Sequence, residues 1–138
     1  MLDTYSSVIL HLGEAYDRGA AYKILINGML AESMLVFSEA VRLGVAMGLD
    51  RGFLLEALPK APVIAPFVAS KVARMQSEDY TDASFPLELV HKDLNLLVET
   101  AYTTGQPLPL AAVAREIYGR ARQSGRGRKD FSAIHAAG

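Results

Sequence analysis

The chain contains no cysteine, and its charges almost cancel over 138 residues. Without cysteine, disulfides, thiolate metal ligands and cysteine nucleophiles are all excluded, and a reducing compartment fits. A net charge of −1 and a pI near 6.3 give no electrostatic case for binding nucleic acid or an anionic membrane. No basic region precedes a continuous apolar core at the N-terminus, as it would in a signal peptide. We therefore expect a cytoplasmic protein with neither nucleic acid nor membrane as a partner.

Common catalytic motifs are missing too. The sequence has no Gly-x-Ser-x-Gly elbow, no Walker phosphate loop and no Gly-x-Gly-x-x-Gly dinucleotide fingerprint. Its three histidines lie far apart in the chain, and none has a second histidine four residues away, so we predict no metal site. The basic segment 125–129 is more typical of a solvated loop than of a phosphate cradle.

Residues 20–47 are the longest regular segment. Ala, Leu and Met dominate it and no Pro interrupts it, which predicts one long helix. Glu32, Glu39 and Arg42 form a narrow polar stripe, so we expect neighbours to bury the helix on several sides. Polar and charged residues interrupt every window of about 20 residues, so an ordinary membrane span is not predicted.

The rest of the chain favours shorter helices. We expect them at residues 51–58 after Asp50 as N-cap, from Pro62 or Pro66 to 76, at 86–103 and at 109–121. Asp130 can cap a terminal turn, and residues 77–84, 105–109 and 124–129 are predicted loops. Residues 1–18 form a lead-in that could be a short strand or a helical turn. Without strand–helix alternation, the prediction is one all-α domain over 1–138, a bundle of five to six helices around the long helix.

Lys23 and Asn27 are the first candidate site residues. They lie four residues apart in an otherwise apolar stretch, so both point from the same face of the predicted helix. Burying a lone ammonium is costly unless it has a role, such as donating a proton or binding an oxyanion. The alternative is an amphipathic detail in which the Lys23 side chain reaches solvent.

A second polar cluster lies at residues 85–95 and contains Phe85, Lys92 and Asp93. Lys92 and Asp93 are adjacent and do not share a helix face, so they are poorly placed to pair with each other. On their chemistry alone, these residues would more often be a solvated face than a site.

In this order and spacing, the two clusters resemble the C-terminal domain of the β-hydroxyacid dehydrogenases, a family that includes 3-hydroxyisobutyrate dehydrogenase. The resemblance covers roughly residues 8–135 and rests on three ordered motifs. They are matched by Gly19, Lys23 and Asn27, then by Phe85, Lys92, Asp93 and Leu94, and finally by Gly125, Gly127, Asp130, Ser132 and Ala133. The sequence departs from the family pattern at Asp17-Arg18-Gly19, where Gly-x-Gly is usual, and at Ile26-Asn27, where Asn-Asn is frequent.

The resemblance implies the helical fold of the 6-phosphogluconate dehydrogenase C-terminal domain, serving substrate binding and dimerisation after an NAD- or NADP-binding Rossmann domain. It implies a catalytic role for Lys23 in moving the proton of the hydroxyl or carbonyl oxygen, and for Asn27 in orienting Lys23 or the substrate. By the same resemblance, Phe85 and Asp93 line or brace the substrate pocket, and Lys92 reaches the nicotinamide end of the cofactor.

The predicted function is that of a substrate domain of an NAD(P)-dependent oxidoreductase for a small 3-hydroxy acid or its semialdehyde. We expect it to be inactive without a Rossmann domain, in cis or in trans. Because residues 20–47 are too apolar for a small domain to cover, we expect a homodimer built on them. Two other readings stay open: a non-catalytic helical oligomerisation module on the same scaffold, and a helical ligand-binding regulator.

Overall fold

A computed structural model describes residues 18–136, so the predicted lead-in lies almost wholly outside the described residues. The described residues form six α-helices: α2 Arg18–Ala46, α3 Arg51–Ala57, α4 Pro66–Ala69, α5 Val72–Ser77, α6 Leu87–Thr104 and α7 Pro109–Ala121. Three shorter turns complete the order: η1 Leu58–Lys60, η2 Arg122–Arg126 and η3 Phe131–Ala136. Within this range the β pairing is limited to an isolated bridge between Pro86 and Asp130. The prediction of an all-α bundle is confirmed.

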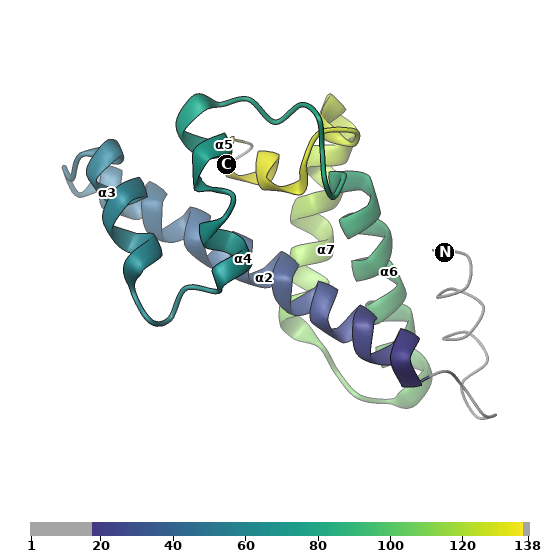
Figure 1. Ribbon diagram of the computed structural model, residues 1–138. Coiled ribbons are helices and arrows are strands. Elements are labelled where there is room, and N and C mark those ends of the chain that lie inside the picture. The colour runs from purple at the N-terminus through teal and green to yellow at the C-terminus, as the bar shows by residue number, and fades with distance from the viewer. Residues whose placement is uncertain (1–17, 137–138) are drawn as a thin grey trace.

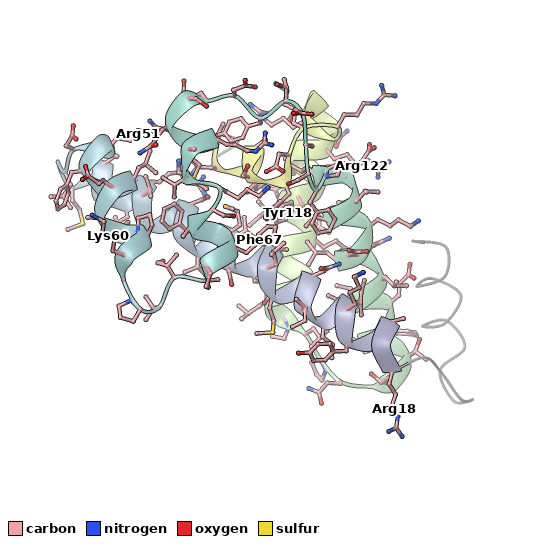
Figure 2. The ribbon with its side chains drawn as sticks, viewed as in Figure 1. Arg18, Arg51, Lys60, Phe67, Tyr118 and Arg122 are labelled. Carbon is pink, nitrogen blue, oxygen red and sulfur yellow. The ribbon has the colours of Figure 1, made fainter. Side chains whose placement is uncertain are left out.

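The long helix α2 is the axis of the fold and runs diagonally through the molecule (Figure 1). Helices α6 and α7 pack along each other and against α2, while α3 and α4 contact α2 elsewhere along its length. The C-terminal turn η3 contacts α2, α5 and α6 and so joins the two groups of helices. Tyr118 on α7 lies at the centre (Figure 2), where its hydroxyl donates to the Ala31 carbonyl of α2 at 3.0 Å.

Local signals fix most helix boundaries where the sequence predicts them. Asp50 caps α3 by accepting a hydrogen bond from the Phe53 amide at 2.9 Å. Gly105 ends α6 in a left-handed conformation with φ of 79°, which glycine adopts without steric cost. Pro109 opens α7, which ends at Ala121 as expected.

Two predicted elements are wrong. The single helix expected from Pro62 or Pro66 to residue 76 is broken into α4 and α5 at Ser70 and Lys71, where the Lys71 side chain turns inward to a distant partner. The loop expected at 124–129 begins inside a π-helical turn, η2.

Helix α2 buries one face rather than its whole circumference. Its close contact with α6 depends on Gly28, because a Cβ atom there would lie 2.5 Å from Cδ1 of Leu97. On the outer face large apolar side chains stay exposed: Tyr22, Leu25, Met29, Val36 and Leu43. The expected burial on several sides is therefore wrong for the single chain, because too few helices surround α2.

Over residues 18–46, helix α2 is long and apolar enough to cross a membrane by length and composition. This is weak support for a span, because the core helix of a globular fold meets the same criterion. Two of its polar side chains bond to other elements, Asn27 to Asp93 and Ser38 to His135, as in a packed core helix. The absence of a membrane partner stays a prediction.

Candidate functional site

A hydrogen bond between α2 and α6 joins the two polar clusters found in the sequence. The Asn27 amide donates from Nδ2 to Oδ2 of Asp93 at 3.0 Å, across 66 residues of chain. Asp93 is buried and Asn27 is half-buried. The next residue of α2, Gly28, packs against Leu97, one turn beyond Asp93 on α6. The two helices thus hold this polar pair at their closest approach.

Burial dominates the electrostatics of Asp93. Loss of solvent raises the pKa of its carboxyl group, while the hydrogen bond from Asn27 and the positive charge of Lys92 act in the opposite direction. A buried carboxylate that accepts an amide hydrogen fixes the direction of that amide, because the carboxylate can only accept. Asp93 is therefore suited to orient Asn27.

Lys23 and Lys92 flank this pair, and both are exposed. Lys23 lies one turn before Asn27 on α2, and Lys92 directly precedes Asp93 on α6. In the chain alone the Lys23 ammonium is not buried, as in the alternative in which its side chain reaches solvent, since α2 is covered on one face only. Both cations are accessible to a substrate, or to another domain that would cover them.

Phe85 lies elsewhere, just before α6 begins. Its ring centroid is 5.9 Å from that of Phe131, and its carbonyl accepts from the Phe131 amide at 2.8 Å. Asp93 lies eight residues further along, about 12 Å at 1.5 Å per residue. The structure brings together Asn27, Asp93 and their lysine neighbours, but it places Phe85 with the C-terminal turn.

Sequence reasoning missed a buried ion pair between Lys71 and Asp130. Nζ of Lys71 lies 2.9 Å from Oδ1 of Asp130, and it also donates to the Ser84 hydroxyl at 2.6 Å. The ammonium lies 5.5 Å from the centroid of the Phe131 ring. No local pattern marks Lys71, since its partner is 59 residues away. The sequence signal nearest to it is the pattern Asp-x-Ser at Asp130, which is typical of a turn in which the Asp carboxylate accepts from the backbone two residues on.

Burial by itself would raise the pKa of Asp130. Hydrogen bonds from Ser132 and Lys71, together with the positive charge of Lys71, outweigh that effect and lower the pKa. The pair ties the start of α5 to the segment before η3, so its role is structural.

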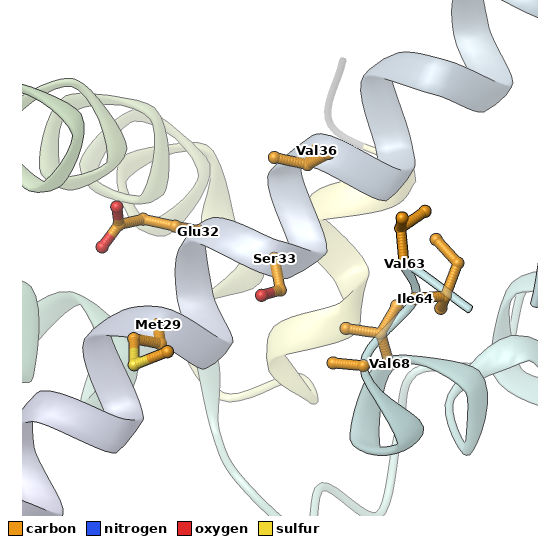
Figure 3. A pocket seen from close by; sticks show the side chains of 8 residues that line it. Met29, Glu32, Ser33, Val36, Val63, Ile64 and Val68 are labelled. Carbon is orange, nitrogen blue, oxygen red and sulfur yellow. The ribbon is translucent and has the colours of Figure 1, made fainter. Parts of the chain in front are cut away.

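Two hollows border the middle of α2, and neither Asn27 nor Asp93 lines them. One, of about 470 Å³, lies between Leu25, Met29 and the segment of residues 107–111. The other, of about 320 Å³, lies between α2 and the residues before and within α4, and Val36, Val63 and Ile64 are among its lining residues (Figure 3). Glu32 lines both, and burial raises the pKa of its carboxyl group. Among the described residues, no group of three or more His, Asp or Glu side chains could hold a metal ion.

A family model described as NAD-binding of NADP-dependent 3-hydroxyisobutyrate dehydrogenase matches residues 18–137. The chain belongs to this family. Membership confirms the resemblance stated from the motifs and supports NAD or NADP as the cofactor of the scaffold. It also identifies the scaffold as that of an oxidoreductase.

Three curated relatives share about a third of their aligned residues with the chain. Glyoxylate/succinic semialdehyde reductase 2, chloroplastic, of Arabidopsis thaliana is 34% identical over 96% of this chain and 37% of its own length. The 2-(hydroxymethyl)glutarate dehydrogenase of Eubacterium barkeri is 33% identical, over 97% and 44%. The mitochondrial 3-hydroxyisobutyrate dehydrogenase of Drosophila melanogaster is 31% identical, over 98% and 43%. The chain thus spans less than half of the length of each.

Solved structures of the family share the fold. The 3-hydroxyisobutyrate dehydrogenase of Salmonella typhimurium superposes with a TM-score of 0.81 at 23% identity, over 91% of this chain and 44% of that one. The Mycobacterium tuberculosis 3-hydroxyisobutyrate dehydrogenase, solved with L-serine, gives a TM-score of 0.70 at 27% identity, over 89% and 44%.

Proposed function

We propose that this chain is the substrate and dimerisation domain of an NAD(P)-dependent oxidoreductase that interconverts a small 3-hydroxy acid and its semialdehyde. It works with a Rossmann domain supplied in cis or in trans. The observation that carries this proposal is the hydrogen bond from Asn27 to Asp93, because it unites the two clusters that the resemblance assigns to one site. The names of the relatives, which include reductases of semialdehydes, support the substrate class.

The residues of this chain suit the substrate side of such a site and not the part that binds the dinucleotide. A dinucleotide's pyrophosphate needs a strand followed by a glycine-rich helix N-terminus, and the described residues provide no such unit. They offer two accessible cations beside a fixed amide, which suits an anionic substrate and the nicotinamide end of a cofactor. NAD(P)H, when bound, supplies the hydride that reduces the carbonyl carbon.

In this proposal Lys23 is the catalytic acid and base. As hydride reaches the carbonyl carbon, negative charge develops on the oxygen, and the ammonium of Lys23 stabilises that charge and then gives up its proton. In the reverse direction the neutral amine removes the hydroxyl proton. Asn27, held by Asp93, orients the substrate oxygen or Lys23, while Lys92 binds at the nicotinamide end and Phe85 braces the wall of the pocket.

The test is a fusion of this chain to the Rossmann domain of a relative such as 2-(hydroxymethyl)glutarate dehydrogenase, assayed with 3-hydroxyisobutyrate and succinic semialdehyde and both nicotinamide cofactors. Lys23→Ala should lower kcat by about 100-fold or more, the contribution typical of general acid–base catalysis. Lys60→Ala is the matched control, because Lys60 is an exposed lysine on η1. An active fusion whose rate is unchanged by Lys23→Ala would remove the catalytic assignment.

A second candidate is a non-catalytic oligomerisation module on the same scaffold. The exposed apolar side chains of α2 favour it, because they offer a contact surface that needs no chemistry. NADPH fluorescence separates the two. The fluorescence of NADPH with a Rossmann domain should change further when this chain is added if it is the enzyme domain, and should stay the same if it is the module. A cytoplasmic location belongs to both proposals.

A further inference from the structure

A hollow near the C-terminal end of α2, away from Lys23 and Asn27, is lined by three arginines. It has a volume of about 450 Å³ and lies between the second half of α2, the end of α7, η2 and η3. Its lining residues are Arg42, Ile117, Arg120, Ala121, Ser124, Arg126 and Ile134. None of them is acidic, so three arginines line a space without a carboxylate. Arg42 also borders a second hollow, together with Glu78 and His135.

Arg42 carries the clearest sign of a missing partner. Its Nη1 atom is buried and has no hydrogen-bond acceptor among the described residues. A buried guanidinium N–H without an acceptor is unfavourable, and native structures rarely keep one unless a ligand or water completes it. Arg51 and Arg74, by contrast, donate to the carbonyls of Met75, Thr81 and Asp82.

Arg126 is held at the rim by its own loop. Its Nη1 donates to the Ser124 hydroxyl at 2.8 Å, and that hydroxyl donates to the Ala121 carbonyl at 2.8 Å. The guanidinium keeps its remaining N–H groups for another acceptor. Glu116, an acid on α7, pairs with Arg115, with 3.3 Å between Nη2 of Arg115 and Oε1 of Glu116.

We propose that this hollow binds a small organic dianion, a phosphate ester or a dicarboxylate. Guanidinium groups bind both through paired N–H···O hydrogen bonds, and the charge of three of them exceeds the two negative charges of such a ligand. The apolar side of the hollow, formed by Ile117, Ala121 and Ile134, would contact the carbon chain. Its volume falls within the range of small-molecule sites.

The site is distinct from the Asn27–Asp93 pair. Arg42 follows Asn27 by four turns of α2, roughly 22 Å along the helix. A ligand in this hollow would therefore not compete for the proposed catalytic site, and its binding does not depend on the proposed function.

The test uses the full 138-residue chain, with glycerol 3-phosphate and succinate as probes in separate calorimetric titrations at matched ionic strength. We expect a Kd of about 1 mM or below for at least one probe. The probe that binds more tightly identifies the ligand class. Arg42→Gln and Arg126→Gln should each raise that Kd about ten-fold or more, because each removes charge-assisted hydrogen bonds. Circular dichroism checks that both variants fold. If Arg42→Gln does not fold, the Kd of the rim variant Arg126→Gln is the test.

Arg128→Gln is the matched control. It removes one positive charge from the same segment, but Arg128 is exposed and does not line the hollow. The proposal is overturned if neither probe binds at about 10 mM. It is also overturned if Arg128→Gln weakens binding as much as the two pocket variants, since the effect would then be general charge attraction.

Discussion

At the scale of single residues, Lys71 and Asp130 form a buried ion pair of the described fold, whereas Lys23 is exposed. The side chain of Asp130 is fully buried and that of Lys71 is 7% exposed, so solvent screens their attraction little. Asp130 also accepts hydrogen bonds from the amide and the hydroxyl of Ser132. Every partner of the Asp130 carboxylate is a donor. Removal of its charge would leave the buried ammonium of Lys71 without its counter-charge.

Asp130→Asn should lower the free energy of unfolding by about 3–5 kcal/mol at pH 7, the usual cost of breaking a buried pair. The pKa of Asp130 is lower in the folded state than its ordinary value of 3.8, so its contribution is present above about pH 4 and lost as pH falls through the folded pKa. Urea unfolding of wild type and variant should therefore converge below about pH 4. Asp82→Asn, at an exposed position, is the control, and a constant difference down to pH 2 would contradict the assignment.

His135 should give the protein a pH dependence in a different range. Burial, followed by the positive charges of Arg51 and Arg42, lowers the pKa of His135 from 6.5 to about 4. Between these values the unfolded chain binds a proton that the folded chain does not, so stability is lost as pH falls from 6.5 to about 4. The loss is up to about 3 kcal/mol.

His135→Asn should remove this pH dependence. The measurement is the free energy of unfolding of wild type and variant at pH 7, 5.5 and 4. The difference between the two should shrink steadily over this range. Parallel profiles would show that His135 takes up its proton equally in the folded and unfolded chains.

At the scale of helices, local sequence signals predicted those helix ends that depend on neighbouring residues in the chain. The bounds of α3, α6 and α7 follow from Asp50, Gly105 and Pro109, each of which acts on its own backbone. The break between α4 and α5 was missed because its cause is remote: Lys71 bonds to Asp130, far along the chain. Local patterns do not show such a pairing.

For the candidate site too, local spacing and motifs could be read from the sequence, but contacts between distant residues could not. Helical spacing placed Lys23 and Asn27 on one face, and the family resemblance assigned Asn27 and Asp93 to one site without predicting the hydrogen bond between them. Spacing could not show what covers Lys23, because coverage depends on neighbouring elements. It also could not separate Phe85 from Asp93, because Phe85 lies just before the helix that contains Asp93, about two turns away.

Gly28 should be intolerant of a branched side chain. Gly28→Val would press on Leu97 at the contact between α2 and α6, and overpacking of this kind costs about 1–3 kcal/mol. Ala40→Val is the control, because Ala40 is exposed on the same helix and a valine there adds a β-branched side chain without overpacking a neighbour. Adding Leu97→Ala to Gly28→Val should recover part of the loss in thermal unfolding. Equal stability of the two single variants would contradict a tight contact.

At the scale of the whole molecule, the described fold leaves one surface without cover. The exposed apolar residues of α2 recur at intervals of three, four and seven along one face, from Tyr22 through Leu25 and Met29 to Val36 and Leu43. The hollow beside Val36 extends this face toward Val63 and Ile64 (Figure 3). A surface of this kind is costly in water, which supports the proposal that a second copy of the chain covers it.

The homodimer proposal predicts a mass twice that of the 14.9 kDa chain in sedimentation equilibrium at about 100 µM. Val36→Glu would bury a charge without a partner at the centre of the interface, so it should weaken the dimer by about 100-fold or more. Val113→Glu adds the same charge at an exposed valine of α7 and should leave the dimer intact. If the wild-type chain sediments as a monomer, α2 is covered by another domain instead. If Val36→Glu leaves the dimer intact, the interface lies on a face other than the exposed apolar face of α2. If both variants dissociate the dimer equally, the added negative charge rather than a contact at Val36 weakens it.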